Sequence, residues 1–164
     1  MIDFVRIPEE RLKTLRRDRK LKEQLEEFTE SKIELDEDIS IECEDPLKIS
    51  RIKMVLQAFG RGFDFDTALN LLDEEYSLEV IEIKDYTGKS RERMIVLKGR
   101  VIGTEGKAKK LIENYTETKI SRYGKTICII GRWNRVMLAK KAVEMLLSGS
   151  LHNTVYRFLE KAKK

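Results

Sequence analysis

The residues best suited to chemistry are two glycines and a group of lysines in the stretch VIGTEGKAKK, residues 101–110. Gly103 and Gly106 stand three positions apart, between an apolar run and a basic one. Glycine has no Cβ, so a ligand can approach its main chain closely, and it tolerates a positive φ. If a helix begins at Lys107, its first N–H groups and its dipole favour an anion there. The spacing therefore indicates a site for a phosphate group.

The elements that must position these glycines occur twice in the chain. Residues 15–33 align with residues 102–120 without a gap, at an offset of 87. One inserted residue later, Ile39-Ser-Ile41 falls on Ile127-Cys-Ile129, and a long helical pattern follows in both places. Two copies of one module explain this similarity most economically.

Apolar residues recur with strand and helix periods at matching places in the two copies. Each copy predicts a strand, two helices, two strands and a helix in that order, β-α-α-β-β-α. The expected strands are 4–7, 32–35 and 39–43, then 78–83, 119–121 and 126–130; the expected helices begin at Pro8 or cover 20–28 and 46–58, then 90–101, 107–115 and 134–147. An extra helix follows each copy, at 65–73 and 150–163. We therefore expect an α+β fold with domains at 1–74 and 75–164, each a three-stranded antiparallel sheet packed on helices.

Composition excludes several classes of protein. The 164 residues are 41% hydrophobic and 38% charged, which suits packed domains. No apolar run is long enough for a membrane span and no signal peptide is evident, so we expect a cytoplasmic protein. Cys43 and Cys128 stand in apolar alternating segments, typical of buried hydrophobes. The sequence contains no Walker loop, catalytic triad or metal-ligand cluster, so we expect no enzyme activity, metal or cofactor.

The net charge of +4 is unevenly distributed. Residues 1–74 carry 13 Lys+Arg against 19 Asp+Glu, a net charge of −6, and residues 75–164 carry 20 against 10, a net charge of +10. Lys and Arg that neutralise phosphates release condensed counterions, so the basic half suits a polyanion. The acidic half is better suited to face a protein.

The glycine pair within this order of elements resembles KH domains of type I. In KH domains a GxxG loop clamps the backbone of about four nucleotides, and single-stranded bases lie in an apolar groove beside it. More narrowly, the segments GRVIG, KAK, IEN and TETKI between residues 99 and 120, with Val155-Tyr156, resemble archaeal relatives of the small-subunit ribosome assembly factors called Partner of Nob or Dim. This resemblance covers nearly the whole chain and implies two tandem KH domains that bind small-subunit rRNA near its 3′ end, with a Nob-type endonuclease as partner.

The candidate RNA-binding residues surround the second glycine loop. Alternatively, the glycines only connect two helices, the lysines form a solvated helix face, and the isoleucines belong first to the core. Tyr123 either stacks on a base or marks a hairpin tip, Trp133 is expected to be a packing anchor, and His152 a surface or capping residue. The candidates are Arg100, Ile102, Gly103, Thr104, Glu105, Gly106, Lys107, Lys109, Lys110, Ile120, Arg122 and Lys125.

The first copy departs from the KH pattern, because its loop reads Arg16-Arg-Asp-Arg19, with arginine at both glycine positions. These side chains occupy the space that a phosphate backbone needs, so we infer a degenerate KH domain used for scaffold or protein contact. Binding of a phosphate from the side by an arginine stays open. The alternative function for the chain is therefore a protein adaptor, whose acidic first module docks onto a translation or RNA-processing factor.

Overall fold

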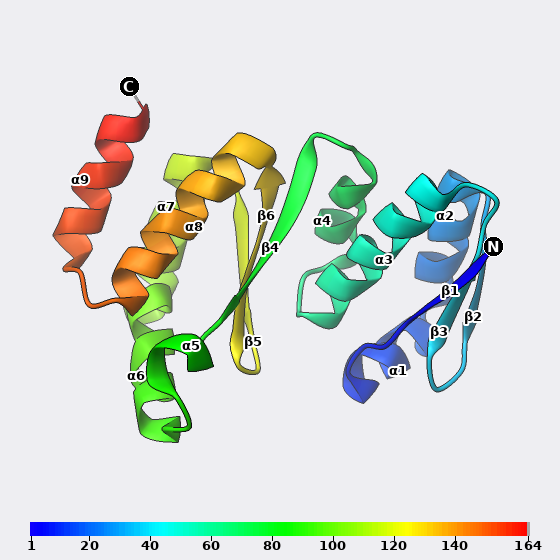
Figure 1. Cartoon of the computed structure of the whole chain (residues 1–164), viewed down its shortest axis with the longest axis horizontal. Helices are drawn as coiled ribbons and strands as arrows, with labels where there is room; N and C mark the ends of the chain where they lie inside the picture. The colour runs from blue at the N-terminus through cyan, green and yellow to red at the C-terminus, as the bar shows by residue number, and fades with distance from the viewer. Residues whose placement is uncertain (164) are drawn as a thin grey trace. The chain divides into compact units, whose positions relative to one another are not determined.

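The computed structural model describes residues 1–163, and the chain divides into two compact units, Met1–Glu74 and Glu75–Lys164. Each unit combines helices with one three-stranded antiparallel sheet, which confirms the expected α+β class. Figure 1 shows the helices of each unit gathered on one side of its sheet. Within residues 1–163, no helix has the length and apolar character that a membrane span requires.

The first unit has the strand order β1-β3-β2. Asp18 caps α2 and Asp45 caps α3, each by accepting a hydrogen bond from a backbone N–H two residues further on. A proline opens α3 in the first helical turn, where its missing N–H is harmless. The elements are β1 (Ile2–Val5), α1 (Glu9–Arg17), α2 (Arg19–Thr29), β2 (Lys32–Leu35), β3 (Ile39–Glu42), α3 (Pro46–Gly60), α4 (Phe65–Leu69) and the 3-10 turn η1 (Asn70–Leu72).

The second unit repeats this arrangement with the strand order β4-β6-β5. Ser90 caps α6 by accepting from the Arg93 N–H at 3.2 Å. The short α5 was not expected, because four residues are too few to show a helical period. The elements are β4 (Tyr76–Glu82), α5 (Lys84–Thr87), α6 (Arg91–Ile102), the 3-10 turn η2 (Thr104–Gly106), α7 (Lys107–Thr116), β5 (Lys119–Tyr123), β6 (Thr126–Arg132), α8 (Trp133–Leu147) and α9 (His152–Lys163).

The core of the second unit lies between the sheet and its helices. Ile127 and Ile129 from the central strand β6 are fully buried, as are Val101 of α6 and Ile112 of α7. These positions fix the two helices that flank the glycine loop against the sheet. Val155 and Leu159 of α9 join the same cluster, so the C-terminal helix belongs to the packed domain.

One set of three hydrogen bonds occurs at the same place in both units. In the second unit the Thr116 hydroxyl bonds to Ile112 O at 2.6 Å and to the Thr118 hydroxyl at 2.8 Å, and the Ile120 N–H donates to the Glu113 carboxylate at 2.8 Å.

The first unit has the counterpart of each bond 87 residues earlier. The Thr29 hydroxyl bonds to Leu25 O at 2.6 Å and to the Ser31 hydroxyl at 2.7 Å, and the Ile33 N–H donates to Glu26 at 2.9 Å. Both helices also end at a glutamate in the left-handed conformation. The repeat in sequence is thus a repeat in structure at the point where the second helix turns into the next strand.

We predict that Thr116→Val and Thr29→Val each destabilise their own unit by about 1–3 kcal/mol, because both side chains are buried and the change leaves a neighbouring hydroxyl without its partner. Thr14→Val is the control, since Thr14 is exposed and bonds only to Glu10 O, at 3.2 Å. Urea unfolding followed by circular dichroism measures the three changes. Equal losses for Thr14 and the two buried threonines would contradict the repeated network.

Candidate nucleic-acid interface

Gly103 holds the corner between α6 and α7 in a conformation that excludes other residues. Its φ of 78° with ψ of 174° lies in a region that is essentially restricted to glycine. A Cβ added to Gly103 would lie 2.7 Å from both the backbone nitrogen and the Cβ of Ala108. Glycine at this position is therefore required by the close approach of the two helices, whether or not a ligand is bound.

Gly106 has a different role, because it faces open space. Its φ of 76° is left-handed, yet a Cβ added there would meet no heavy atom within 4 Å. Gly106 is also the N-cap of α7, and no side chain from residues 1–163 caps this helix. The start of α7 therefore presents bare main chain with the positive end of a helix dipole, which favours an anion.

Cationic side chains surround this bare main chain. Lys107 and Lys110 are exposed and Lys109 is half-buried, all within the first turn of α7. Thr104 and Glu105 are exposed, and Glu105 is left-handed, with φ 56°. A helix N-terminus with three lysines and one glutamate keeps a net positive charge for a phosphate.

The hairpin between β5 and β6 lies at the same end of the unit as the glycine loop. Only two residues separate α7 from β5, and the bond between Glu113 and the Ile120 N–H holds them side by side, so β5 runs back toward the start of α7. Five strand residues cover about 16 Å, close to the length of a ten-residue helix. The exposed side chains of Arg122 and Lys125 are thereby carried toward the glycine loop.

Arg100 has internal partners instead of an outward orientation. Its Nε donates to Leu146 O at 3.1 Å, and a second guanidinium nitrogen donates to Ser150 O. It therefore caps the last carbonyls of α8 and fastens the following connection to α6. RNA contact by Arg100 stays a prediction, and its structural role is to hold the end of α6 in place.

The helix α9 supports the corner from outside the repeated module. The Nε2 of His152 lies 2.8 Å from Arg100 O, close to the end of α6. Further along, the Tyr115 hydroxyl donates to the Glu160 carboxylate at 3.1 Å. This hydrogen bond raises the pKa of the Tyr115 hydroxyl, with smaller contributions from burial and from the charge of Glu160. The expectation of a capping or surface role for His152 agrees with this position.

Apolar surface next to the loop comes from residues outside the predicted set. Ile95 and Val96 of α6 are 69% and 62% exposed, and Gly99 on the same helix has open space where a Cβ would be. The sequence signal that could have identified this surface is that Ile95 and Val96 are apolar but fall outside the core-facing helical period of α6. Ile102 is partly buried, whereas Ile120 is 3% exposed and belongs to the core, so contact of either with RNA stays a prediction.

One expectation about the second unit is wrong. Trp133 was expected to anchor the packing, but it is 67% exposed, because it is the first residue of α8 and projects before the helix meets the core. Cys43 and Cys128 are buried and form no disulfide within residues 1–163, as predicted. Tyr123 is half-buried at the end of β5, which leaves its stacking role untested.

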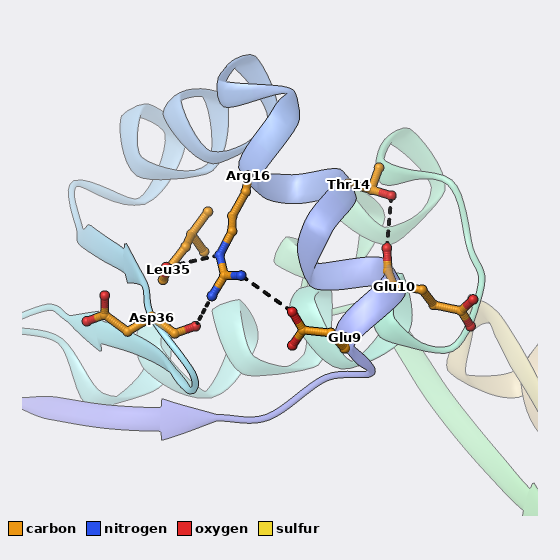
Figure 2. A network of polar contacts seen from close by, with 6 residues as sticks. All are labelled: Glu9, Glu10, Thr14, Arg16, Leu35 and Asp36. Carbon is orange, nitrogen blue, oxygen red and sulfur yellow. Dashed lines mark hydrogen bonds and ion pairs between the residues drawn. The ribbon is translucent and has the colours of Figure 1, made fainter.

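The corresponding corner of the first unit is closed by side chains. Only Asp18 separates α1 from α2, and its carboxylate accepts from the Lys20 N–H at 3.2 Å, where an anionic ligand would otherwise bind. Figure 2 shows Arg16, at the first glycine position, reaching across to Leu35 O at 3.4 Å and Asp36 O at 2.7 Å. Arg16 therefore ties the end of α1 to the β2–β3 loop.

The second unit matches a known domain family over nearly all of its length. Residues 77–164 fit the profile of the second KH domain of PNO1, described as a eukaryotic-type KH domain, KH-domain type I. The corner just described is thus the GxxG loop of a KH domain.

Two of the similar proteins match this chain over nearly all of its length. A KH domain-containing protein of Methanocaldococcus jannaschii is 39% identical over 99% of this chain and 74% of its own length. The pre-rRNA-processing protein PNO1 of Candida glabrata is 36% identical over 68% of this chain, which spans 43% of that longer protein. A Dim2p complex with a/eIF2alpha and rRNA from Pyrococcus horikoshii matches with a TM-score of 0.89 and 34% identity over 99% of this chain and 94% of the matched chain.

We predict that alanine has different effects at the two glycines. Gly103→Ala should destabilise the second unit by about 3 kcal/mol or more, because it combines backbone strain with overlap against Ala108. Gly106→Ala should lower the free energy of unfolding by only about 1 kcal/mol. This is the usual cost of placing a residue other than glycine in the left-handed conformation where no neighbour is in the way. Urea unfolding of the two variants measures this, and equal losses would contradict the assigned geometry.

Proposed function

Because this chain belongs to the PNO1/Dim2 family of KH-domain proteins, we propose that it binds single-stranded rRNA in the assembly of the small ribosomal subunit, near the 3′ end of that RNA and through its second KH domain. Support comes from the relatives, since one is a pre-rRNA-processing protein and another crystallised with rRNA. We assign the chain no catalytic activity and a cytoplasmic location.

The observation that carries this proposal is the bare main chain at Gly106. A phosphodiester lies flush against a helix N-terminus only where no Cβ intervenes, and Gly106 has open space on that side. Lys107, Lys109 and Lys110 add the charge that makes phosphate binding strong at low salt. The expected site residues from Gly103 to Lys110 therefore act together as a backbone clamp.

Bases would then lie beside the clamp on apolar surface. Ile95 and Gly99 stand four residues apart on α6 and share a face with Ile102, three residues further on. Gly99 leaves this face flat, which suits a planar base, and KH domains hold unstacked bases in such a groove. Arg122 and Lys125 close the opposite side from the hairpin.

We propose that the first unit is a degenerate KH domain, which makes the chain a tandem of two. The three hydrogen bonds repeated at an offset of 87 residues, on the same order of strands and helices, support a common origin. Its corner differs because Asp18 and Arg16 occupy the place of the bare loop. The base groove is accordingly assigned to the second unit alone.

Charge at position 106 tests the clamp. We predict that Gly106→Asp weakens binding of an RNA from the 3′ end of small-subunit rRNA by about tenfold or more, because a carboxylate then faces the phosphate at close range. Gly106→Asn is the matched control, since Asn has the same size, tolerates a left-handed φ and adds no charge. Fluorescence anisotropy over a range of salt concentrations measures both variants and the unchanged chain, and a Gly106→Asp variant that binds as tightly as the unchanged chain would reject the clamp.

A second function, protein binding by the acidic first unit, has support from one relative. The matching Dim2p structure includes a/eIF2alpha, an initiation-factor subunit, in addition to rRNA. Acidic side chains of the β2–β3 hairpin, Glu34, Asp36 and Glu37, are exposed in this chain. We propose that these side chains contribute to docking of a translation factor, with a Nob-type endonuclease as a further candidate.

Charge reversal tests this contact. Replacing Glu34, Asp36 and Glu37 with lysine should abolish capture of the purified initiation-factor subunit in the presence of RNase, because opposite charges then become like charges. The control reverses Glu27, Glu30 and Glu44, which are also exposed and change the net charge equally. Loss of capture in both variants, or in neither, would reject the hairpin as the docking surface.

A further inference from the structure

The acidic first unit contains one strongly basic corner. Five of its 13 cationic residues fall between positions 16 and 22, in the sequence RRDRKLK, together with a single acid. This segment has a net charge of +4, and the rest of the unit has −10. The corner joins α1 to α2, which is the position that the GxxG loop holds in the second unit.

Arg16 forms the fixed base of this corner. Its guanidinium donates to Asp36 O at 2.7 Å and to Leu35 O at 3.4 Å, and lies 3.5 Å from the Glu9 carboxylate (Figure 2). With these partners on one side, Arg16 connects the helices to the β2–β3 loop. The main-chain route used by the second unit is therefore closed, and any ligand must be bound by side chains.

The remaining cations are available to a ligand. Arg17, Arg19 and Lys20 are exposed, and none of them forms an ion pair with any residue from 1 to 163. Lys22 pairs with Glu26 at 3.8 Å on the next turn. Three unpaired cations on one exposed turn repel each other, and an anion between them would relieve that repulsion.

Arg19 and Lys22 of this corner line a pocket together with Arg16. It has a volume of about 440 Å³ and is lined by Arg16, Arg19, Lys22, Glu23 and Leu35.

Three acids, one on α1, one at the α1–α2 corner and one in the β2–β3 loop, have partners of their own. Asp18 accepts from the Lys20 N–H, Glu9 lies against Arg16, and Asp38 binds the Nε of Arg6 at 2.7 Å. Glu23 is the one acid in the pocket wall, so the pocket keeps a cationic character.

We propose that this corner, formed by Arg17, Arg19 and Lys20 around the Arg16 base, is a second phosphate-binding site that contacts the RNA backbone without reading its bases. Arginine forks bind phosphate oxygens by paired hydrogen bonds, and side chains need no bare main chain. The site extends the proposed function, on which it rests, from one RNA contact to two. The first unit therefore keeps the phosphate contact of its module and has lost the groove.

RNA fits this corner better than an acidic protein segment does. The corner occupies the same position in the repeated module as the clamp at Gly106, which is the phosphate site of the second unit. Exposed cations on one turn bind phosphates and impose no sequence preference. Backbone contacts of this kind add affinity mainly for RNA that extends beyond the groove of the second unit.

The test compares a short RNA from the 3′ end of small-subunit rRNA with the same RNA carrying a long unstructured extension. The 164-residue chain should bind the extended RNA about tenfold more tightly than the short RNA. Arg17→Glu with Arg19→Glu should remove this gain, leave the affinity for the short RNA unchanged and lower the salt slope for the extended RNA by about 1.4, the value for two phosphate contacts on a single strand. Glutamate at position 19 also suits the first turn of α2, so folding is retained.

The control is Lys32→Glu with Lys48→Glu, an equal change of charge on exposed residues of the same unit near the opposite end of α2. This variant should keep the gain. The inference fails, while the proposed function stands, if the extension adds no affinity or if both variants lose it equally. It also fails if poly-glutamate competes for the corner as well as the extension does, because the ligand is then an acidic protein segment. Failure of the wild-type chain to bind the short RNA would reject the proposed function itself.

Discussion

The close contact between Gly103 and Ala108 determines the geometry of the second unit's functional corner. A Cβ on Gly103 would lie only 2.7 Å from the backbone nitrogen of Ala108, so no other residue fits where the chain turns from α6 into α7. This contact fixes the direction in which α7 begins and leaves Gly106 on the open side. Packing and binding are thus divided between the two glycines. Arg100, near the end of α6, donates to the carbonyls of Leu146 and Ser150. These bonds tie the end of α6 to the end of α8 and to the connection between α8 and α9.

The two units share an order of elements but differ in structure at this corner. The repeated hydrogen bonds at Thr29 and Thr116 show that the helix-to-strand turn is the same in both. In the second copy the corner consists of bare main chain with lysines around it. In the first, Asp18 caps the helix and Arg16 braces the hairpin, so the backbone is covered and the remaining cations face outward. A loop without these glycines no longer lets a ligand approach its main chain closely, but it can still present cationic side chains.

The period of apolar residues was sufficient to predict the order of the elements. The bounds of β2 match the prediction, and most others differ by one or two residues, because fraying at the ends depends on caps and neighbours. Local spacing could not separate the roles of Gly103 and Gly106, since the difference lies in a contact with Ala108 on the next helix. The partners of Arg100 could not be predicted from local spacing either, because they lie 46 and 50 residues away along the chain. The prediction that Trp133 is a packing anchor was wrong for a related reason. The size of tryptophan favours burial, but the exposure of Trp133 depends on where α8 meets the core.

The central claim is that a sugar–phosphate backbone binds the main chain at the start of α7. The most direct measurement is an NMR titration of the isotopically labelled full-length chain with RNA from the 3′ end of small-subunit rRNA, following backbone amide shifts. The largest changes should fall on the amides from Thr104 to Lys109, with smaller changes along the exposed face of α6. Large changes elsewhere in the second unit, with these amides unmoved at saturation, would contradict it.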